Sequence, residues 1–484
     1  MGLKTGEQYK ESLRDGRNVY ISGERVSDVT THPAFRSMVE NIARLYDMHF
    51  DAEIGQHLTT TSNGERVSRF HKFPETREDL EHVRLGTLAA LSEIGGTLDR
   101  FGDETASALF TLHDNKDILQ QHDARYAAAV DHWLGRLQST QEFMTSANTD
   151  PKGDRSKQPF EQDDLDMHVR VVEENDDGIV IRGAKFETGA SYANVAFVKP
   201  TVGSWGDKNK DFAVACVVPL NHPNITHICR RSMASGTTSF DRPLTYHADE
   251  IDTLIVMDNV FVPWQDVFFS RNPVVAQELR AHLHRFGAYS YLIRALSKAD
   301  LLVGAALMVT GHSKLSNIPS IQEKLSQLML YRQTIYGHVI SAEADCYVGK
   351  NGVMYPGQTQ IYAGRMYAAL NYHHAIHTLR DLAGGSAVLV PDRASLESSE
   401  TGGVVKKYFR VGSVEAEDRL RVLNLVADLT SSSYAGQKAV YQMFAESPPH
   451  VQAATLFRSY DQSTSIARAK RILERADELD RILG

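Results

Sequence analysis

The spacing of apolar residues divides the chain into three stretches. From about residue 33 to residue 145, apolar positions recur mostly at i, i+3 and i+4, most clearly in 82–101 and 123–144. This spacing predicts amphipathic helices. After Asn272 the helical spacing returns and continues through most of the remaining chain. Four long helices are expected there, enough for a bundle that buries their apolar stripes, at residues 289–315, 321–347, 360–385 and 416–444.

The middle of the chain has the pattern of strands. Residues 146–164 are dense in Asp, Pro, Gly and Ser, which predicts a long loop. In 167–198, Val and Ile alternate with polar residues around an Asn-Asp-Asp-Gly turn, a strong hairpin signal. Residues 211–220 and 252–263 are further strand candidates. The order predicts an α+β fold with an N-terminal helical domain, a β-barrel or sandwich domain and a C-terminal four-helix bundle, at residues 1–145, 146–270 and 271–484.

The composition is that of an ordinary globular protein and excludes several classes of function. The length of 484 residues suggests about three domains. The net charge of −9 argues against a nucleic-acid partner, because phosphates repel an acidic protein. No run approaches the ~20 apolar residues that cross a membrane, and the polar first residues lack the apolar core of a secretory signal. The 3 cysteines are too few and too scattered for a disulfide framework, so we expect a cytoplasmic protein.

The loop before the predicted hairpin is the most informative stretch. It places hydrogen-bond donors and cations beside glycine and proline turns, an arrangement that can present N–H groups to a diphosphate or to the polar edge of a flavin. The same composition also fits a solvated connector. The candidate cofactor contacts are Asn148, Thr149, Asp150, Lys152, Gly153, Asp154 and Arg155 in the loop, with Lys185 on the following strand.

Two glycine-containing turns also allow a backbone to approach a ring closely. Thr188 and Gly189 end the second hairpin strand, and Thr188 offers a hydroxyl group there; a simple β-turn explains these residues equally well. Gly384 and Gly385 close the third predicted bundle helix. They are expected to cap that helix, and they also leave room for the cofactor of a neighbouring subunit.

Histidines and one arginine are the remaining candidates. His373, His374 and His377 have the i, i+4 spacing of a zinc pair, but no acid is placed as a third ligand, so we reject a metal site. Arg100 lies among predicted helices, where a cation needs a partner. Asp99, Asp103, Glu104 or a bound anion would supply it.

Five segments, taken together and in this order, resemble the 4-hydroxyphenylacetate 3-monooxygenase (oxygenase component) and 4-hydroxybutyryl-CoA dehydratase superfamily. The likeness covers essentially the whole chain. It implies an acyl-CoA dehydrogenase-like fold, FAD bound between the β domain and the bundle, and a homotetramer. The segments are VYISGERVSDVTTHPAFR, TDPKGDRSKQP, MHVRVVEENDDGIVIRGAKFETGA, LIVMDNVFVPWQDVF and DLAGGSAVLVP.

The dehydratase branch of this superfamily holds a 4Fe–4S cluster on three cysteines and one histidine. The first two cysteines would fall near Gly96 and Arg100, and Tyr289 is the nearest match to the histidine. The third cysteine would fall within 285–300, a segment that contains no cysteine. Such a cluster needs thiolates, so this chain lacks the cluster of the dehydratases.

The monooxygenase branch uses FADH₂ from a separate reductase and hydroxylates a phenol through a C4a-hydroperoxyflavin. Its phenol contacts are an arginine, a tyrosine four residues later and a histidine before the flavin loop. The arginine matches Arg100, whereas Glu104 takes the tyrosine position and Ser146 the histidine position. These departures put a simple 4-hydroxyphenylacetate-like substrate in doubt.

A second histidine of that branch, near the start of the bundle, also has no direct counterpart. Tyr289 takes its position, and His282 and His284 lie just upstream. We expect Arg100 to bind the phenolate, Ser146 or Tyr289 to be its hydrogen-bond partner, and His282 or His284 to be the base.

The resemblance leaves three functions open. The favoured one is an FADH₂-dependent, two-component monooxygenase that hydroxylates a phenolic or related aromatic substrate, either free or on a carrier. The second is a cluster-free dehydratase-like FAD enzyme acting on an acyl-CoA or another non-aromatic substrate, which would need neither O₂ nor a reductase. The third is a flavin-binding homologue without catalysis, since fold alone does not fix function.

Overall fold

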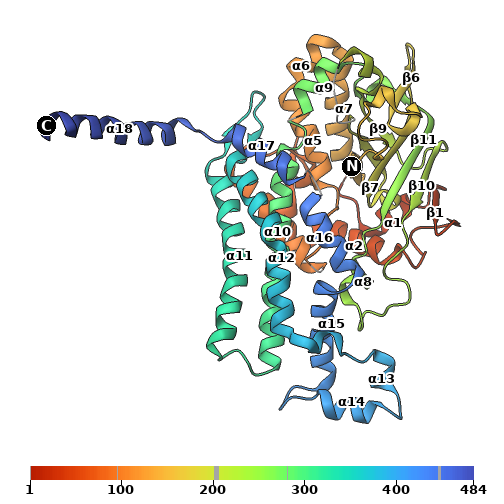
Figure 1. Ribbon diagram of the computed structural model, residues 1–484. Coiled ribbons are helices and arrows are strands. Elements are labelled where there is room, and N and C mark those ends of the chain that lie inside the picture. The colour runs from red at the N-terminus through yellow and green to blue at the C-terminus, as the bar shows by residue number, and fades with distance from the viewer. Residues whose placement is uncertain (1, 95, 201–205, 281, 445–447, 484) are drawn as a thin grey trace.

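The computed structural model has the predicted order of helices, strands and long helices. Figure 1 shows the β sheets and the N-terminal helices side by side, with the long helices running away from them as a bundle. This is the α+β architecture expected from the sequence. Backbone alone is described at Glu104 and Arg280, and the structure as a whole describes residues 2–94, 96–200, 206–280, 282–444 and 448–483.

Helices α1 to α7 make up most of the N-terminal part. The start of α4 is a capping box, in which Thr76 and Asp79 each accept the other's backbone N–H. Buried alanines and leucines line the inner faces of α5 and α7. The bounds are Gly6–Ser12 for α1, Arg36–Asp47 for α2, Gly55–Leu58 for α3, Arg77–Glu93 for α4, Asp103–Asp114 for α5, Lys116–His122 for α6 and Ala124–Thr140 for α7.

Two N-terminal strands were not predicted from the sequence. β1 (Asn18–Ile21) pairs in parallel with β10 (Ile225–Cys229), and β2 (Glu24–Val26) pairs with β1. The four-residue β1 is held by a partner about 200 residues away, so local spacing does not signal it. The N-terminal part therefore shares a sheet with the β domain. β3 (Thr59–Ser62) and β4 (Glu65–Ser68) form a separate hairpin.

The β domain contains two sheets. The larger has the strand order β2-β1-β10-β11-β7-β6, and the smaller has the order β12-β9-β8-β5. The predicted hairpin is confirmed as β6 and β7, and the predicted strand 252–263 is β11. The strand bounds are Met144–Ala147 for β5, Arg170–Glu174 for β6, Gly178–Thr188 for β7, Val195–Val198 for β8, Ala215–Pro219 for β9, Asp252–Pro263 for β11 and Val267–Phe269 for β12.

One face of β7 changes chemistry along its length. Ile179 and Ile181 point into the core, and the same alternation then buries Lys185 and Glu187. Since a strand has a period of two residues, all four side chains lie on one face. Two charged side chains at inward positions indicate that the end of β7 faces a polar site rather than the apolar core.

The C-terminal bundle is centred on three long helices. α10, α11 and α12 pack side by side, and shorter helices complete the bundle (Figure 1). The bounds are Pro243–Ala248 for α8, Pro273–Arg280 for α9, Arg285–His312 for α10, Pro319–Ala344 for α11, Gln358–Ala383 for α12, Arg393–Glu397 for α13, Gly402–Phe409 for α14, Ala416–Thr430 for α15, Ser433–Phe444 for α16, Pro449–Ser459 for α17 and Ser463–Leu483 for α18; the short hairpin strands β13 and β14 are Tyr347–Val348 and Met354–Tyr355.

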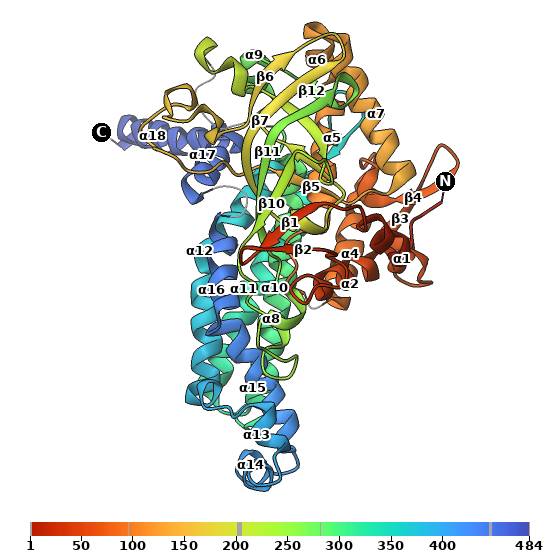
Figure 2. The same cartoon turned by 90° about the vertical axis from the view of Figure 1, so that its right-hand side faces the viewer.

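The fourth predicted bundle helix, 416–444, is broken in the structure into α15 and α16. Ser432 lies at the break, where its hydroxyl accepts the backbone N–H of Ala435 at 3.0 Å and so begins the new helix. α18 extends away from the rest of the chain (Figures 1 and 2). No helix within the described ranges has the length and apolar character that a membrane span requires.

Buried neutral histidines make the stability of this fold depend on pH. Burial lowers the pKa of His49 and of His227 to about 4, and that of His71 to about 3. The unfolded chain takes up protons near pH 6.5, whereas the folded chain does not. We therefore expect the free energy of unfolding to fall as the pH drops from about 6.5 to about 4, by at most about 1.4 kcal/mol per pH unit for each histidine.

His227 provides the test, because it is fully buried and its Nε2 lies 2.8 Å from the Leu220 carbonyl. In His227→Gln, the urea concentration at the midpoint of unfolding should fall less than in wild type as the pH drops from 6.5 to 4.5. The exposed His374→Gln should leave that decline unchanged. An identical slope for wild type and His227→Gln would contradict this explanation.

Candidate active site

Four buried charged side chains meet where the three parts of the chain join. Asp99 lies between α4 and α5, is 0% exposed, and forms ion pairs with Lys298 of α10 and, at 2.7 Å, with Lys438 of α16. Lys438 also pairs with Glu250, next to β11, at 2.5 Å. Because a buried charge must be paired, this network requires the N-terminal part, the β domain and the bundle to meet at this point.

The network fixes the position of Arg100. The Glu250 carboxylate accepts the backbone N–H of Asp99 at 2.9 Å and that of Arg100 at 2.8 Å. The Arg100 side chain pairs through Nε with Glu187 at 2.8 Å. The backbone and the guanidinium group of Arg100 are thus held by two different segments of the β domain. Asp103, which the sequence offered as a possible partner of Arg100, pairs with Arg294 instead.

Burial and pairing set the charges of this network. Burial lowers the pKa of Lys298 and raises the pKa of Glu250 and of Glu187. Burial opposes the charge of Asp99 as well, but Lys298 and Lys438 overcome it and lower its pKa. Asp99 and Glu250 likewise overcome burial and raise the pKa of Lys438 well above its usual value. The network therefore holds a stable ion pair at Lys438, whereas Lys298 releases a proton more easily than an ordinary lysine.

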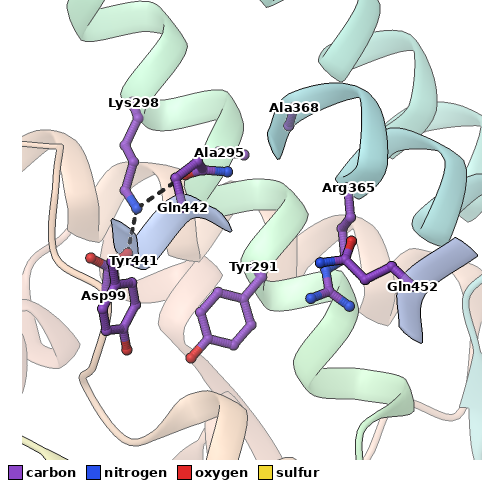
Figure 3. A pocket seen from close by; sticks show the side chains of 9 residues that line it. All are labelled: Asp99, Tyr291, Ala295, Lys298, Arg365, Ala368, Tyr441, Gln442 and Gln452. Carbon is purple, nitrogen blue, oxygen red and sulfur yellow. Dashed lines mark hydrogen bonds and ion pairs between the residues drawn. The ribbon is translucent and has the colours of Figure 1, made fainter. Parts of the chain in front are cut away.

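A narrow pocket opens beside this network. The room that it leaves for the centre of a water-sized sphere is about 20 Å³, and Figure 3 shows the polar side chains that converge on it. Lys298 lies between Asp99 and Gln442, the latter at 3.5 Å. The lining residues are Asp99, Tyr291, Ala295, Lys298, Arg365, Ala368, Tyr441, Gln442 and Gln452.

Two tyrosines connect the pocket to Arg100. The guanidinium carbon of Arg100 lies 5.1 Å from the ring centre of Tyr291 and 5.6 Å from that of Tyr441. The hydroxyl groups of both tyrosines are buried and find no hydrogen-bond partner among the described residues. A buried polar group without a partner costs about 1–3 kcal/mol, so these hydroxyls are suited to a bound polar molecule.

The predicted cofactor loop is anchored at its start and exposed at its tip. Thr149 exchanges two backbone hydrogen bonds with Phe186 of β7, at 2.7 and 3.3 Å. Asp150 pairs with the fully buried Lys185 at 2.6 Å. Asn148 and Asp150 are half-buried, whereas the segment 152–156, which contains Lys152, Gly153, Asp154 and Arg155, is exposed. The loop is therefore fixed to the strand that carries Glu187 and Thr188.

Thr188 and Ser146 lie on β7 and β5, which belong to different sheets but contact each other. Thr188 donates its hydroxyl hydrogen to Asp252 at 2.6 Å, and Gly189 follows with φ of +80°. Ser146, on β5, is buried and hydrogen-bonded to the Thr105 hydroxyl at 3.0 Å. Glu104 precedes Thr105 in α5, and its side chain lies outside the described part of the structure.

Tyr289 does not face the pocket. Its hydroxyl donates to Glu343 of α11 at 2.6 Å, and Glu343 pairs with Arg84 of α4 at 2.6 Å. Tyr291 is the tyrosine beside Arg100. Two residues along a helix correspond to a rotation of roughly 200°, which is why the two side chains point to opposite sides of α10.

Other predicted residues lie away from Arg100. His282 and His284 precede α10, and burial lowers the pKa of His282 to about 4. Gly384 and Gly385 follow α12, and both have open space where a side chain would begin. They lie about 20 residues, or roughly 28 Å along the helix axis, beyond Arg365. They do not contribute to the pocket of their own chain.

Sequence reasoning missed most of the charged network. Lys298 lies in a mostly apolar helix, and Glu187 occupies an inward position of β7, so both carried a signal. Glu250 and Lys438 lie in segments with no such contrast. Their roles depend on contacts between parts of the chain that are distant in sequence.

No group of three or more potential metal ligands occurs within the ranges that the structure describes. Gly96 does lie beside Ser297 of α10, whose hydroxyl donates to its carbonyl at 3.1 Å. Cys216 and Cys229 are instead buried in the β domain, and Cys346 follows α11.

Comparison with known proteins agrees with this arrangement. One relative is an FADH₂-dependent monooxygenase, TftD, of Burkholderia cepacia, 28% identical over 94% of this chain and 89% of its own. The oxygenase component of 4-hydroxyphenylacetate 3-monooxygenase, solved with FAD, superposes with a TM-score of 0.91 at 24% identity, over 98% of this chain and 99% of its own. A 4-hydroxybutyryl-CoA dehydratase of N. maritimus superposes with a TM-score of 0.89 at 25% identity, over 98% and 95% of the two chains.

Two family descriptions match nearly the whole chain. Residues 5–269 match the 4-hydroxyphenylacetate 3-hydroxylase N terminal family, and residues 276–474 match the corresponding C terminal family. The predicted superfamily is thereby confirmed. The chain belongs to the 4-hydroxyphenylacetate 3-hydroxylase family.

Proposed function

We propose that this protein is the oxygenase component of a two-component monooxygenase, which uses FADH₂ and O₂ to hydroxylate a phenolic or related aromatic substrate. The observation that carries the proposal is Arg100, which Glu250 and Glu187 hold beside a pocket. Two tyrosine hydroxyls there have no hydrogen-bond partner in the part of the chain that the structure describes. The family and the FADH₂-dependent relative support the same reaction. A separate flavin reductase would supply the FADH₂.

The residues near the junction suit a flavin. The proposed contacts are the loop Asn148–Arg155, Lys185, Thr188 and Gly189, with Gly384 and Gly385 contributed by a neighbouring subunit. Gln437, whose Oε1 is buried and unpaired among the described residues, adds an acceptor next to them. When bound, the reduced flavin would activate O₂ for transfer of one oxygen atom.

Arg100 would hold the substrate as a phenolate. A fixed cation lowers the pKa of a phenol beside it, which makes the ring a better nucleophile. Burial raises the pKa of Tyr441 well above its usual value, although Arg100 opposes the shift. Tyr441 therefore stays protonated and can donate a hydrogen bond to the substrate.

Lys298 would take part by holding or releasing a proton at Nζ. Its pKa is lowered by burial, and it lines the pocket. The low exposure of the network also keeps water away from the reacting groups. We propose that Tyr291 takes the role expected of Tyr289, that Ser146 borders the substrate from β5, and that His284 does not act in this pocket. The side chain of Glu104 lies outside the described part of the structure.

The reaction is tested most simply with labelled oxygen. Purified protein supplied with chemically reduced FAD and ¹⁸O₂ should incorporate one ¹⁸O atom into a phenol, without the reductase being present. Mass spectrometry of the product measures this. Complete flavin oxidation with unlabelled or unchanged phenols across a broad panel would contradict the proposal.

Arg100→Lys tests the role of the guanidinium group. Lysine keeps the charge but loses the Nε contact to Glu187 and the planar stacking between the two tyrosines. We expect kcat/KM for the phenol to fall about 100-fold, equivalent to about 2.7 kcal/mol, with FAD affinity unchanged within about threefold. Arg77→Lys, at the exposed start of α4, is the matched control. Normal kcat/KM in Arg100→Lys would exclude a role that only the guanidinium group can fill.

A cluster-free dehydratase-like activity is the second candidate, favoured by the close match to the dehydratase fold. Anaerobic turnover of an acyl-CoA with FAD and no reductase would support it. A non-catalytic flavin-binding homologue is the third candidate, and it would bind FAD without consuming O₂ productively.

We further propose a homotetramer located in the cytoplasm. Apolar side chains on the outer surfaces of α10, α11 and α12 are exposed, among them Leu330 at 63% and Leu370 at 51%, which fits a subunit interface. The three cysteines are free thiols, as a reducing compartment keeps them.

A further inference from the structure

The proton of the Thr188 hydroxyl is committed to a carboxylate. Thr188 ends β7 and donates to Asp252 Oδ1 at 2.6 Å, and the two residues face each other in the β7–β11 register. The other oxygen of Asp252 accepts from Arg230 Nε at 3.0 Å and from Gln437 Nε2 at 2.8 Å. An ionised carboxylate only accepts hydrogen bonds. Thr188 can therefore offer only the lone pairs of its oxygen to a bound molecule.

The same carboxylate orients a second acceptor. Because Gln437 Nε2 donates to Asp252, the other end of its amide must be the carbonyl oxygen. This Oε1 atom is buried and meets no donor among the described residues. A buried acceptor without a donor is costly. Gln437 Oε1 is thus suited to a molecule that brings a hydrogen-bond donor, and the Thr188 oxygen can accept a hydrogen bond from the same molecule.

This polar edge adjoins the Arg100 site. Thr188 follows Glu187, which holds Arg100. Gln437 precedes Tyr441 by four residues in α16, so the two lie on one face of that helix. Tyr441 in turn packs against Arg100. The acceptors and the pocket therefore belong to one junction between β7 and α16.

We propose that Asp252 sets the hydrogen-bond polarity of the Thr188 site, so that the protein binds reduced flavin more tightly than oxidised flavin. The inference rests on the proposed function, in which Thr188 contacts the flavin ring, and it takes N5 as the ring atom that Thr188 meets. Position N5 of a reduced flavin carries a hydrogen and donates, whereas N5 of an oxidised flavin has a lone pair and accepts. Only the reduced form complements the oxygen of Thr188.

Such a preference suits an enzyme that receives FADH₂ from another protein. It would retain the reduced cofactor until O₂ has reacted and then release FAD for renewed reduction. Linkage makes the ratio of the two dissociation constants equal to a shift in the midpoint potential. A tenfold preference corresponds to about 30 mV for this two-electron couple.

Asp252→Asn reverses the direction of the hydrogen bond between residue 252 and the Thr188 hydroxyl, with almost no change in the shape of the side chain. Arg230 and Gln437 both donate to one oxygen, so the new amide should place its carbonyl there and its NH₂ toward Thr188. The hydroxyl hydrogen of Thr188 is then free to point at the flavin. Asp258→Asn is the matched control, because Asp258 lies on the same strand with its side chain 75% exposed.

Anaerobic titration of the full-length protein measures the dissociation constants of FADH₂ and of FAD by fluorescence. Wild type and Asp258→Asn should both favour FADH₂, and Asp252→Asn should narrow that preference about tenfold. Thr188→Val, which removes the hydroxyl, should narrow it similarly. The double variant should change the ratio of the two dissociation constants no more than either single variant does, since both substitutions act through one hydrogen bond.

The outcomes separate this inference from the proposed function. The proposed role of Asp252 would be overturned, with flavin binding intact, if Asp252→Asn left the ratio of the FAD and FADH₂ dissociation constants unchanged. The same holds if adding Asp252→Asn to Thr188→Val changed this ratio further. If Asp252→Asn does not fold, an unchanged ratio in Thr188→Val overturns it. Failure of the wild type to bind either flavin would overturn the proposed function and this inference together.

Discussion

The ion network of Asp99, Lys298, Lys438 and Glu250 is the constraint on which the site depends. Its members come from the segment before α5, from α10, from α16 and from the segment before β11, and each is almost fully buried. Charges taken out of water are stable only with their partners in place. The three parts of the chain must therefore dock in one geometry, and that geometry places Arg100 between Tyr291 and Tyr441.

Two kinds of polar surface result from this docking. On one side, Lys298 and Arg365 line a narrow pocket, and Arg100 lies behind two of its tyrosines, whose hydroxyls find no partner within the described ranges. On the other, Asp252 turns Thr188 and Gln437 into hydrogen-bond acceptors. The first surface suits a phenolate and the second a reduced flavin. Hydroxylation of a phenol needs both molecules at one junction, where water is excluded.

The sequence predicted the order of elements well, because long amphipathic helices and alternating strands are local patterns. It placed β11 at the residues where the structure has it, and it singled out Arg100 and Thr188. It missed β1, which is held by a strand about 200 residues away. It chose Tyr289 over Tyr291 because the resemblance to the family gave a position on α10 but not the side of the helix that faces the pocket. Glu250 and Lys438 depend on tertiary contacts that no local pattern reports.

The most direct measurement is a crystal structure of the protein with FAD and a phenolic substrate or unreactive analogue bound. We predict that the isoalloxazine ring lies at the junction of β7 and α16, with the phenol oxygen in contact with Arg100 and the ion network intact. A flavin bound elsewhere, or a phenol that leaves Arg100 paired with Glu187 alone, would contradict the assignment of this junction as the active site.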